Sequence, residues 1–165
     1  MDRDRTVVEF DALYAAEWGR LAGALALVCG DRRTAEETAQ ETFARAWSHW
    51  RTVRRLDRPA GWLYTTGFRL VRRRMRRLDA RTTVTDTPPE TATVDDLATL
   101  DRVTLTRALA ALPDRQREAV VAHHVLGLSS TEVGAALGVT DAAARQLVHR
   151  GITALRASTE LEPSP

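Results

Sequence analysis

The chain has 165 residues, of which 44% are hydrophobic, enough for one ordinary domain or two small ones with a buried core. Its 24 basic side chains are all arginine and face 22 acidic ones, so the net charge is only +2. A single cysteine, Cys29, excludes an internal disulfide and a cysteine-based zinc site, and no run approaches the ~18 apolar residues of a membrane helix. The N-terminus is charged from its second residue, unlike a signal peptide, so we expect a soluble, cytoplasmic protein.

Three amphipathic helices are predicted in the first half of the chain. Apolar residues recur every three or four positions between residues 8 and 28, and a glycine–aspartate pair then interrupts the pattern. A second helix is predicted from about Thr34 to Trp50. The third is predicted to begin at Pro59, because proline is favoured in the first turn of a helix, and its apolar positions continue to Leu78.

The third predicted helix carries the densest positive charge. Six arginines occupy nine positions in the stretch RLVRRRMRR, residues 69–77. Residues 51–77 hold ten arginines against one acid, Asp57, whereas a solvated helix face usually mixes both signs. Such a concentration of cations is typical of proteins that bind nucleic-acid phosphates. The exclusive use of arginine suits phosphate recognition, although a GC-rich genome would produce the same choice.

A linker is predicted between two helical domains. The stretch DARTTVTDTPPETATVDD, residues 79–96, is rich in threonine, proline and acid and has little to bury, which indicates a flexible acidic linker rather than a long loop. Helices are predicted again beyond it, and no segment shows the alternation of a strand. The sequence therefore predicts an all-α protein with two small helical domains, residues 1–78 and 97–160, joined by this linker.

Residues 129–151 have the spacing of a helix-turn-helix. Ser129 or Ser130 is expected to cap its first helix, Gly138 to end that helix in a left-handed turn, and Thr140 to cap the second helix. Apolar positions of the second helix point inward and leave four polar side chains outward: Arg145, Gln146, His149 and Arg150. Arginine can make two hydrogen bonds to guanine and glutamine two to adenine, so this face suits a major groove, although a solvated helix face has a similar composition.

At this point the chain resembles the extracytoplasmic-function (ECF) sigma factors, the two-domain class of bacterial transcription initiation factors. The resemblance rests on five motifs: AEETAQETFARAW (35–47), RPAGWLY (58–64), LPDRQREAVV (112–121), GLSSTEVGAALGVT (127–140) and RQLVHRGITALR (145–156). They occur in the family's order, on either side of the linker, and cover most of the chain. The resemblance implies a sigma region 2-like helical bundle at 1–78, a sigma region 4-like helix-turn-helix domain at 97–160, no enzymatic activity, no cofactor and no metal.

The resemblance also implies roles for particular residues. Glu37, Gln40 and Glu41, which share one helix face, match the surface that docks on the clamp helices of the largest subunit of core RNA polymerase, and a contact with the polymerase flap is implied as well. Arg145, Gln146, His149 and Arg150 match the residues that read the minus-thirty-five element. The loop 51–58 and the third helix match the part that melts and reads the minus-ten element and binds the DNA backbone, through Arg54, Arg55, Arg69, Arg72, Arg73, Arg76 and Arg77, with Arg74 as a further phosphate contact.

The chain departs from the family's pattern in the third helix. Arg69 stands where an asparagine that helps to hold a flipped base is common, and Arg73 stands where a polar or acidic residue is usual, so the minus-ten preference is not implied. Two other hypotheses stay open. One is a stand-alone helix-turn-helix regulator, which explains only the second half of the chain, and the other is a sigma-like helical protein that binds a partner. The resemblance further suggests an anti-sigma factor as a partner and no membrane insertion.

Overall fold

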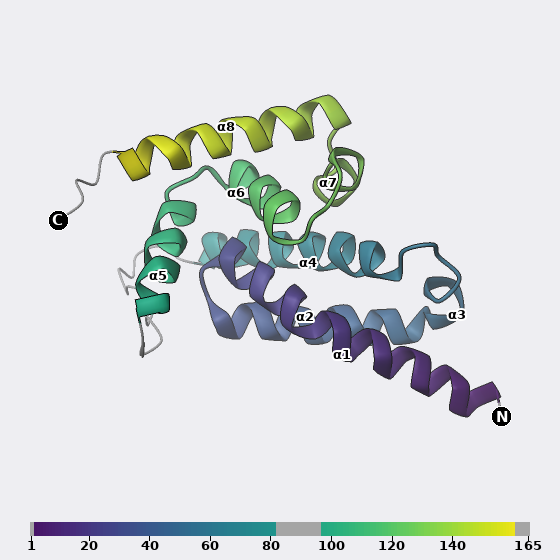
Figure 1. Ribbon diagram of the computed structural model, residues 1–165. Coiled ribbons are helices and arrows are strands. Elements are labelled where there is room, and N and C mark those ends of the chain that lie inside the picture. The colour runs from purple at the N-terminus through teal and green to yellow at the C-terminus, as the bar shows by residue number, and fades with distance from the viewer. Residues whose placement is uncertain (1, 82–96, 161–165) are drawn as a thin grey trace.

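The computed structural model describes residues 2–81 and 97–160, and both segments are helical (Figure 1). The elements in chain order are α1 (Asp2–Cys29), α2 (Arg32–Ser48), α3 (Trp50–Val53), α4 (Pro59–Arg81), α5 (Leu97–Ala110), α6 (Asp114–Val120), the π-helix η1 (Val121–Val125), α7 (Ser130–Leu137) and α8 (Asp141–Glu160). Neither segment contains a strand, which confirms the all-α prediction. Most of the predicted linker lies outside the described residues, and α4 continues to Arg81, beyond the predicted end of the first domain.

Helices α1, α2 and α4 form a bundle around a shared apolar core (Figure 1). The largest buried side chains of this core come from all three helices: Leu21, Leu25, Val28, Phe43, Leu63, Phe68 and Val71. The buried hydroxyl of Tyr64 donates a hydrogen bond to Glu17, so this buried carboxylate has a partner. Asp31 caps α2 by accepting a hydrogen bond from the backbone N–H of Thr34 at 3.0 Å, as expected of an aspartate that follows the interrupting glycine.

Helix α1 is more hydrophobic than the sequence analysis recognised. One of its 18-residue windows has the length and hydropathy of a membrane span, contrary to the expectation that no run approaches one. In the structure Leu21, Leu25 and Val28 of this helix are buried in the bundle core. Packing in the bundle core accounts for these buried positions, which belong to the 22% of the window that is buried.

The second domain contains the predicted helix-turn-helix. Ser129 accepts a hydrogen bond from the N–H of Glu132 at 3.2 Å, and the Glu132 carboxylate accepts one from the N–H of Ser129 at 2.8 Å, which forms a capping box at the start of α7. Gly138 ends α7 with φ 69°, and Thr140 Oγ1 accepts a hydrogen bond from the N–H of Ala143 at 3.1 Å. The predicted turn chemistry is confirmed at these positions, whereas the π-helix η1 was not anticipated.

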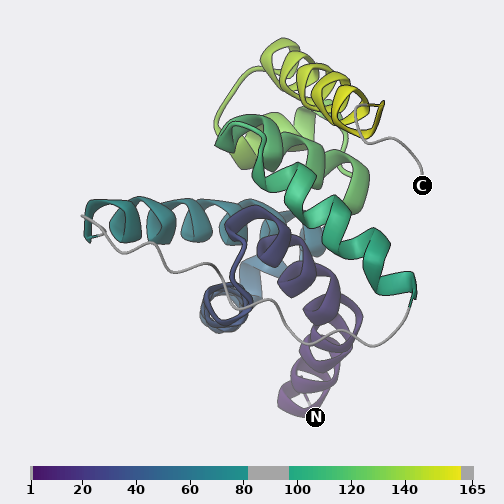
Figure 2. The same ribbon diagram turned by 90° about the vertical axis from the view of Figure 1, so that its left-hand side faces the viewer.

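The two domains pack against each other along α4. In Figures 1 and 2, α6 and α7 lie between α4 and α8, so α8 is on the side of the molecule away from α1 and α2. The Arg72 guanidinium pairs with the Glu118 carboxylate of α6 at 3.1 Å and donates to the backbone oxygen of Ala136 in α7 at 3.0 Å. Arg58, next to the start of α4, pairs with Glu132 of α7. The two described segments of the chain are therefore in direct contact.

Close backbone packing inside the helix-turn-helix generates the first prediction. A Cβ atom on Gly134 would lie 2.7 Å from the backbone oxygen of Val139, so alanine there would force the backbone to move. We expect Gly134→Ala to lower the free energy of unfolding by about 1–3 kcal/mol in urea titrations. Gly23→Ala is the matched control, because no atom lies within 4 Å of its added carbon, and it should raise the stability by about 0.5–1 kcal/mol. Equal effects of the two substitutions would contradict the close packing.

The buried carboxylate between the domains generates the second prediction. Glu118 is 1% exposed and lies between Arg72 and, at 3.6 Å, Arg115. Burial raises the pKa of Glu118, and the two guanidinium groups offset part of that shift. We expect Arg72→Met to lower the free energy of unfolding by about 3–5 kcal/mol at neutral pH, because it leaves a buried carboxylate without its closest partner. The double variant Arg72→Met/Glu118→Gln should recover most of this loss.

The pH dependence of the same variants has a defined sign. A carboxyl whose folded pKa is raised contributes stability that is complete below its unfolded pKa and is lost as the pH rises through the folded pKa. The cost of Arg72→Met should therefore be small below pH 4.5, the usual pKa of a glutamate, and should grow as the pH rises. The double variant should show no such growth in urea titrations across this range. A cost of Arg72→Met that is the same at every pH would contradict the role of Glu118.

Candidate nucleic-acid interface

The four side chains predicted to contact bases are exposed on α8. Arg145, Gln146, His149 and Arg150 line an open hollow of about 360 Å³, and none of these side chains has a hydrogen-bond or ion-pair partner within residues 2–81 and 97–160. Ala144, on the opposite side of the helix, is buried. The capped turn thus orients α8 so that its polar face is available to a ligand, as the helical spacing indicates.

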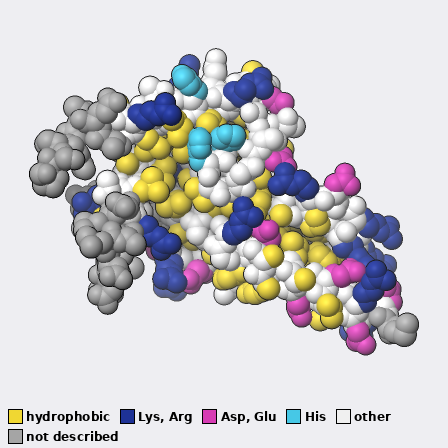
Figure 3. Space-filling view, in the orientation of Figure 1, with side chains coloured by type: hydrophobic (Ala, Val, Ile, Leu, Met, Phe, Trp, Pro, Cys, Tyr) yellow, Lys and Arg dark blue, Asp and Glu magenta, His cyan; other side chains and the backbone are white. Residues whose placement is uncertain are grey.

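A histidine pair extends this polar face beyond α8. A neighbouring hollow of about 290 Å³ is lined by His123 and His124 of η1 together with Arg145, His149 and Arg156. Figure 3 shows histidine and arginine side chains over α8 and just below it. Burial is the main cause that lowers the pKa of His124, and the nearby His123 and Arg156 lower it further. Sequence reasoning gave this pair no role, because only the fold brings η1 next to α8.

The arginines of α4 do not form one surface. Arg69, Arg73, Arg76 and Arg77 are exposed and point away from the bundle core. Arg72 is half-buried in its contacts with Glu118 and Ala136, and Arg74 pairs with Glu37 at 3.3 Å and with Glu41 at 2.7 Å. Two of the six arginines therefore stabilise contacts within the protein, and four remain available to an external anion.

The predicted docking residues lie together on the surface of α2. Glu37 and Gln40 are exposed, Glu41 is half-buried, and Thr38 and Ala39 are buried behind them. Glu37 pairs with Arg33 at 3.1 Å, and Glu41 pairs with Arg45 at 2.9 Å in addition to Arg74. The hydrogen bond from Arg74 lowers the pKa of Glu41 and keeps this carboxyl charged. A partner that docks on this face would therefore contact two carboxylates, Glu37 and Glu41, that already form ion pairs within the protein.

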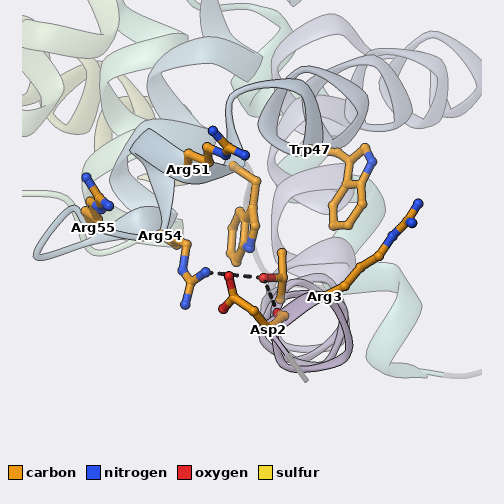
Figure 4. Close-up of a pocket in the computed structure, with 8 residues that line it drawn as sticks. Asp2, Arg3, Trp47, Arg51, Arg54 and Arg55 are labelled. Carbon is orange, nitrogen blue, oxygen red and sulfur yellow. Dashed lines mark hydrogen bonds between the residues drawn. The ribbon is translucent and has the colours of Figure 1, made fainter.

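The residues predicted in the loop 51–58 are divided between two environments. Arg55 is exposed, whereas Arg54 is half-buried, pairs with Glu9 of α1 at 2.9 Å and donates to Thr6 at 3.3 Å. Both line a cavity between α3 and the start of α1 (Figure 4). No group of histidine, cysteine or acidic residues suited to a metal ion occurs among the described residues.

Two family models match the chain, one in each of its two described segments. The model of Sigma-70 region 2 matches residues 13–81, and the model of Sigma-70 region 4 matches residues 102–155. The chain is 32% identical over 133 residues to the ECF RNA polymerase sigma factor SigL of Mycobacterium tuberculosis, which covers 77% of this chain and 75% of SigL. It is 34% identical over 158 residues to the RNA polymerase sigma factor CarQ of Myxococcus xanthus, which covers 93% of this chain and 91% of CarQ.

Solved structures, one of a sigma factor, share the fold. The sigma factor RpoE, in its complex with the anti-sigma factor NepR from Bartonella quintana, matches with a TM-score of 0.72 at 19% identity and covers 94% of this chain and 99% of RpoE. CnrH, in its complex with the cytosolic domain of CnrY, matches with a TM-score of 0.67 at 22% identity and covers 93% of this chain and 89% of CnrH. At these identities the structural matches establish the fold, while the sequence matches extend over both domains. The chain therefore belongs to the ECF sigma factors of bacterial RNA polymerase.

Proposed function

We propose that this sigma factor binds core RNA polymerase and directs it to promoters by reading two DNA elements, one with each domain. The observation that carries the proposal is the exposed face of α8, whose Arg145, Gln146, His149 and Arg150 have no partners among the described residues, on a chain whose other domain matches Sigma-70 region 2. A stand-alone helix-turn-helix regulator would explain α8 but would leave that first domain without a role.

The two reading surfaces use different chemistry. The side chains of α8 contact base edges of the minus-thirty-five element in the major groove, where arginine and glutamine can each make two hydrogen bonds to one base. The exposed arginines of α4, Arg69, Arg73, Arg76 and Arg77, together with Arg55, bind phosphates around the minus-ten element. Arg72 has a structural role between the domains, because Glu118 and Ala136 already occupy its guanidinium.

The polymerase contact involves the acidic face of α2. Glu37, Gln40 and Glu41 dock on the clamp helices of the largest subunit, and the second domain contacts the flap. The protein acts in the cytoplasm by positioning polymerase on DNA, with no catalysis of its own. An anti-sigma factor is a further proposed partner, and the complex of RpoE with NepR supports this for a protein of the same fold.

Transcription with purified core enzyme tests the proposal. The chain should co-purify with core polymerase and start transcription at promoters located by genome-wide mapping of the bound complex. Those promoters should share two sequence elements at a fixed spacing. The proposal is wrong if the chain never associates with core and supports no initiation at the mapped sites. A dimer that protects a palindromic operator without polymerase would instead favour the stand-alone regulator.

Substitutions on α8 separate base reading from general affinity. Replacement of Arg145 or Arg150 by alanine should cost about 1–3 kcal/mol of binding free energy at particular base pairs and relax the preference there. Affinities of the variant holoenzymes for a set of single-base promoter variants provide the measurement. Arg107→Ala on α5 is the control, because Arg107 is exposed but lies off α8. Equal losses on every promoter sequence would mean that these arginines contact only phosphates.

A further inference from the structure

Three of the four histidines of the chain lie around one hollow between η1 and α8. His123 and His124 belong to η1, and His149 belongs to the polar face of α8. The hollow has a volume of about 290 Å³ and shares Arg145 and His149 with the hollow proposed to contact bases. Figure 3 shows histidine side chains gathered on this face. The fourth histidine, His49, follows α2 in the first domain, so the clustering of the other three requires an explanation.

The lining of this hollow contains cations and no acid. Arg145 and Arg156 of α8 are its charged residues besides the histidines. Helix α7 contributes only Ser130, while its acid Glu132 pairs with Arg58 and closes the capping box at the start of α7. Within the described part of the chain, no carboxylate therefore lines the hollow to stabilise a charged imidazole.

The charged groups of the helices packed behind η1 are engaged elsewhere. Arg20 of α1 donates to the Leu126 carbonyl at 3.4 Å. On α6, Glu118 pairs with Arg115 at 3.6 Å, and Arg117 donates to backbone carbonyls of α1 and α5. No residue of α1 or α6 lines the hollow. The charge that a histidine meets there comes from the other histidines and from the two arginines of α8.

The two histidines of η1 lie close enough to influence each other. Their ring centroids are 4.8 Å apart, and the rings meet edge-on at 86°. His123 Nδ1 lies 2.7 Å from the backbone oxygen of Leu128, and because a carbonyl only accepts, this nitrogen carries the proton. The Nε2 of His123 is therefore the nitrogen that takes up a second proton. A proton added to either ring is repelled by the cations around the hollow.

An anion in the hollow would reverse this balance. In the free protein the pKa of His124 lies below its usual value of 6.5, so this imidazole is neutral at neutral pH. A phosphate beside the ring stabilises the charged form and raises its pKa. A group whose pKa is higher in the complex than in the free protein takes up a proton on binding. The affinity then increases as the pH falls through the range between the two pKa values.

We infer that promoter binding by this chain takes up a proton at the histidine cluster, His123, His124 and His149, so that its affinity for promoter DNA increases as the pH falls. The inference rests on the proposed function, which places α8 in the major groove of the minus-thirty-five element. A backbone phosphate at the edge of that groove is the anion that enters the hollow, because Arg145 and His149 line both hollows. The cluster thereby makes the promoter contact of this chain sensitive to pH.

The affinity of the complete holoenzyme for promoter DNA, measured between pH 8 and pH 6, tests the inference. The ratio of wild-type affinity to that of His124→Gln should increase about 3- to 10-fold as the pH falls over this range, because one proton changes an affinity by at most about tenfold per pH unit. His124→Arg, which carries a fixed charge, should bind more tightly than wild type at pH 8 and lose the pH dependence of this position. All holoenzymes contain the same core enzyme, so pH effects on the polymerase cancel in these ratios.

A matched variant and modified DNA make the test specific. His49→Gln removes the one histidine outside the cluster and should keep the pH dependence of wild type. Neutral methylphosphonates, placed in turn at single phosphates around the minus-thirty-five element, locate the anion. At one position this replacement should abolish the difference between wild type and His124→Gln. The tighter binding expected of His124→Arg at pH 8 is a gain that a folding defect could not produce.

Four results would overturn the inference. A holoenzyme that binds and opens promoters with the same pH dependence in wild type and His124→Gln would leave the proposed function intact and remove the proton uptake. Equal changes in His49→Gln and His124→Gln would place the titration outside the cluster. A pH dependence that disappears when a chelator is added would make the three histidines a metal site instead. If wild-type holoenzyme binds no promoter at all, the proposed function fails and this inference fails with it.

Discussion

The pairing of Arg72 with the buried carboxylate of Glu118 is the contact on which the arrangement of the two domains depends. A carboxylate that is 1% exposed requires cationic partners, and here the nearer one, Arg72 at 3.1 Å, comes from the other domain, whereas Arg115 of α6 lies at 3.6 Å. The same guanidinium donates to the backbone of Ala136 in α7, so it fixes α4 against both α6 and α7. Because α7 and α8 are joined by a tight capped turn, this contact also determines where the exposed face of α8 points.

The local structure could be predicted from the sequence because its determinants are local. The spacing of apolar residues defines the helices, and Ser129, Gly138 and Thr140 define the ends of the helix-turn-helix. The exposure of Arg145 and Arg150 follows from the same periodicity, since the buried side of α8 is read directly from its apolar positions. Features that depend on hydrogen bonds along one stretch of chain were accessible without the fold.

The long-range ion pairs that separate the paired arginines of α4 from the exposed ones could not be predicted in this way. Arg72 and Glu118 are 46 positions apart, and Arg74 and Glu41 are 33 apart, so no helical period relates them. From the sequence, all six arginines are equally good candidates for a phosphate contact. Only the packing of α4 against α2 and α7, with Glu118 of α6 beside Arg72, distinguishes the paired ones from the exposed ones. The cavity beside α3 was not predicted for the same reason, because its lining residue Arg3 is far along the chain from Trp47 and Arg55.

We propose that the chain's charges are distributed over surfaces with separate tasks: base reading on α8, phosphate binding on α4 and polymerase docking on α2. Site-specific photocrosslinking of the promoter complex tests this division most directly, with a photoreactive residue placed at Gln146 in one variant and at Arg69 in another. Gln146 should crosslink to intact duplex at the upstream element, and Arg69 to a separate tract at the edge of the melted DNA. Crosslinks from both positions to the same tract, or none from Gln146, would contradict the division.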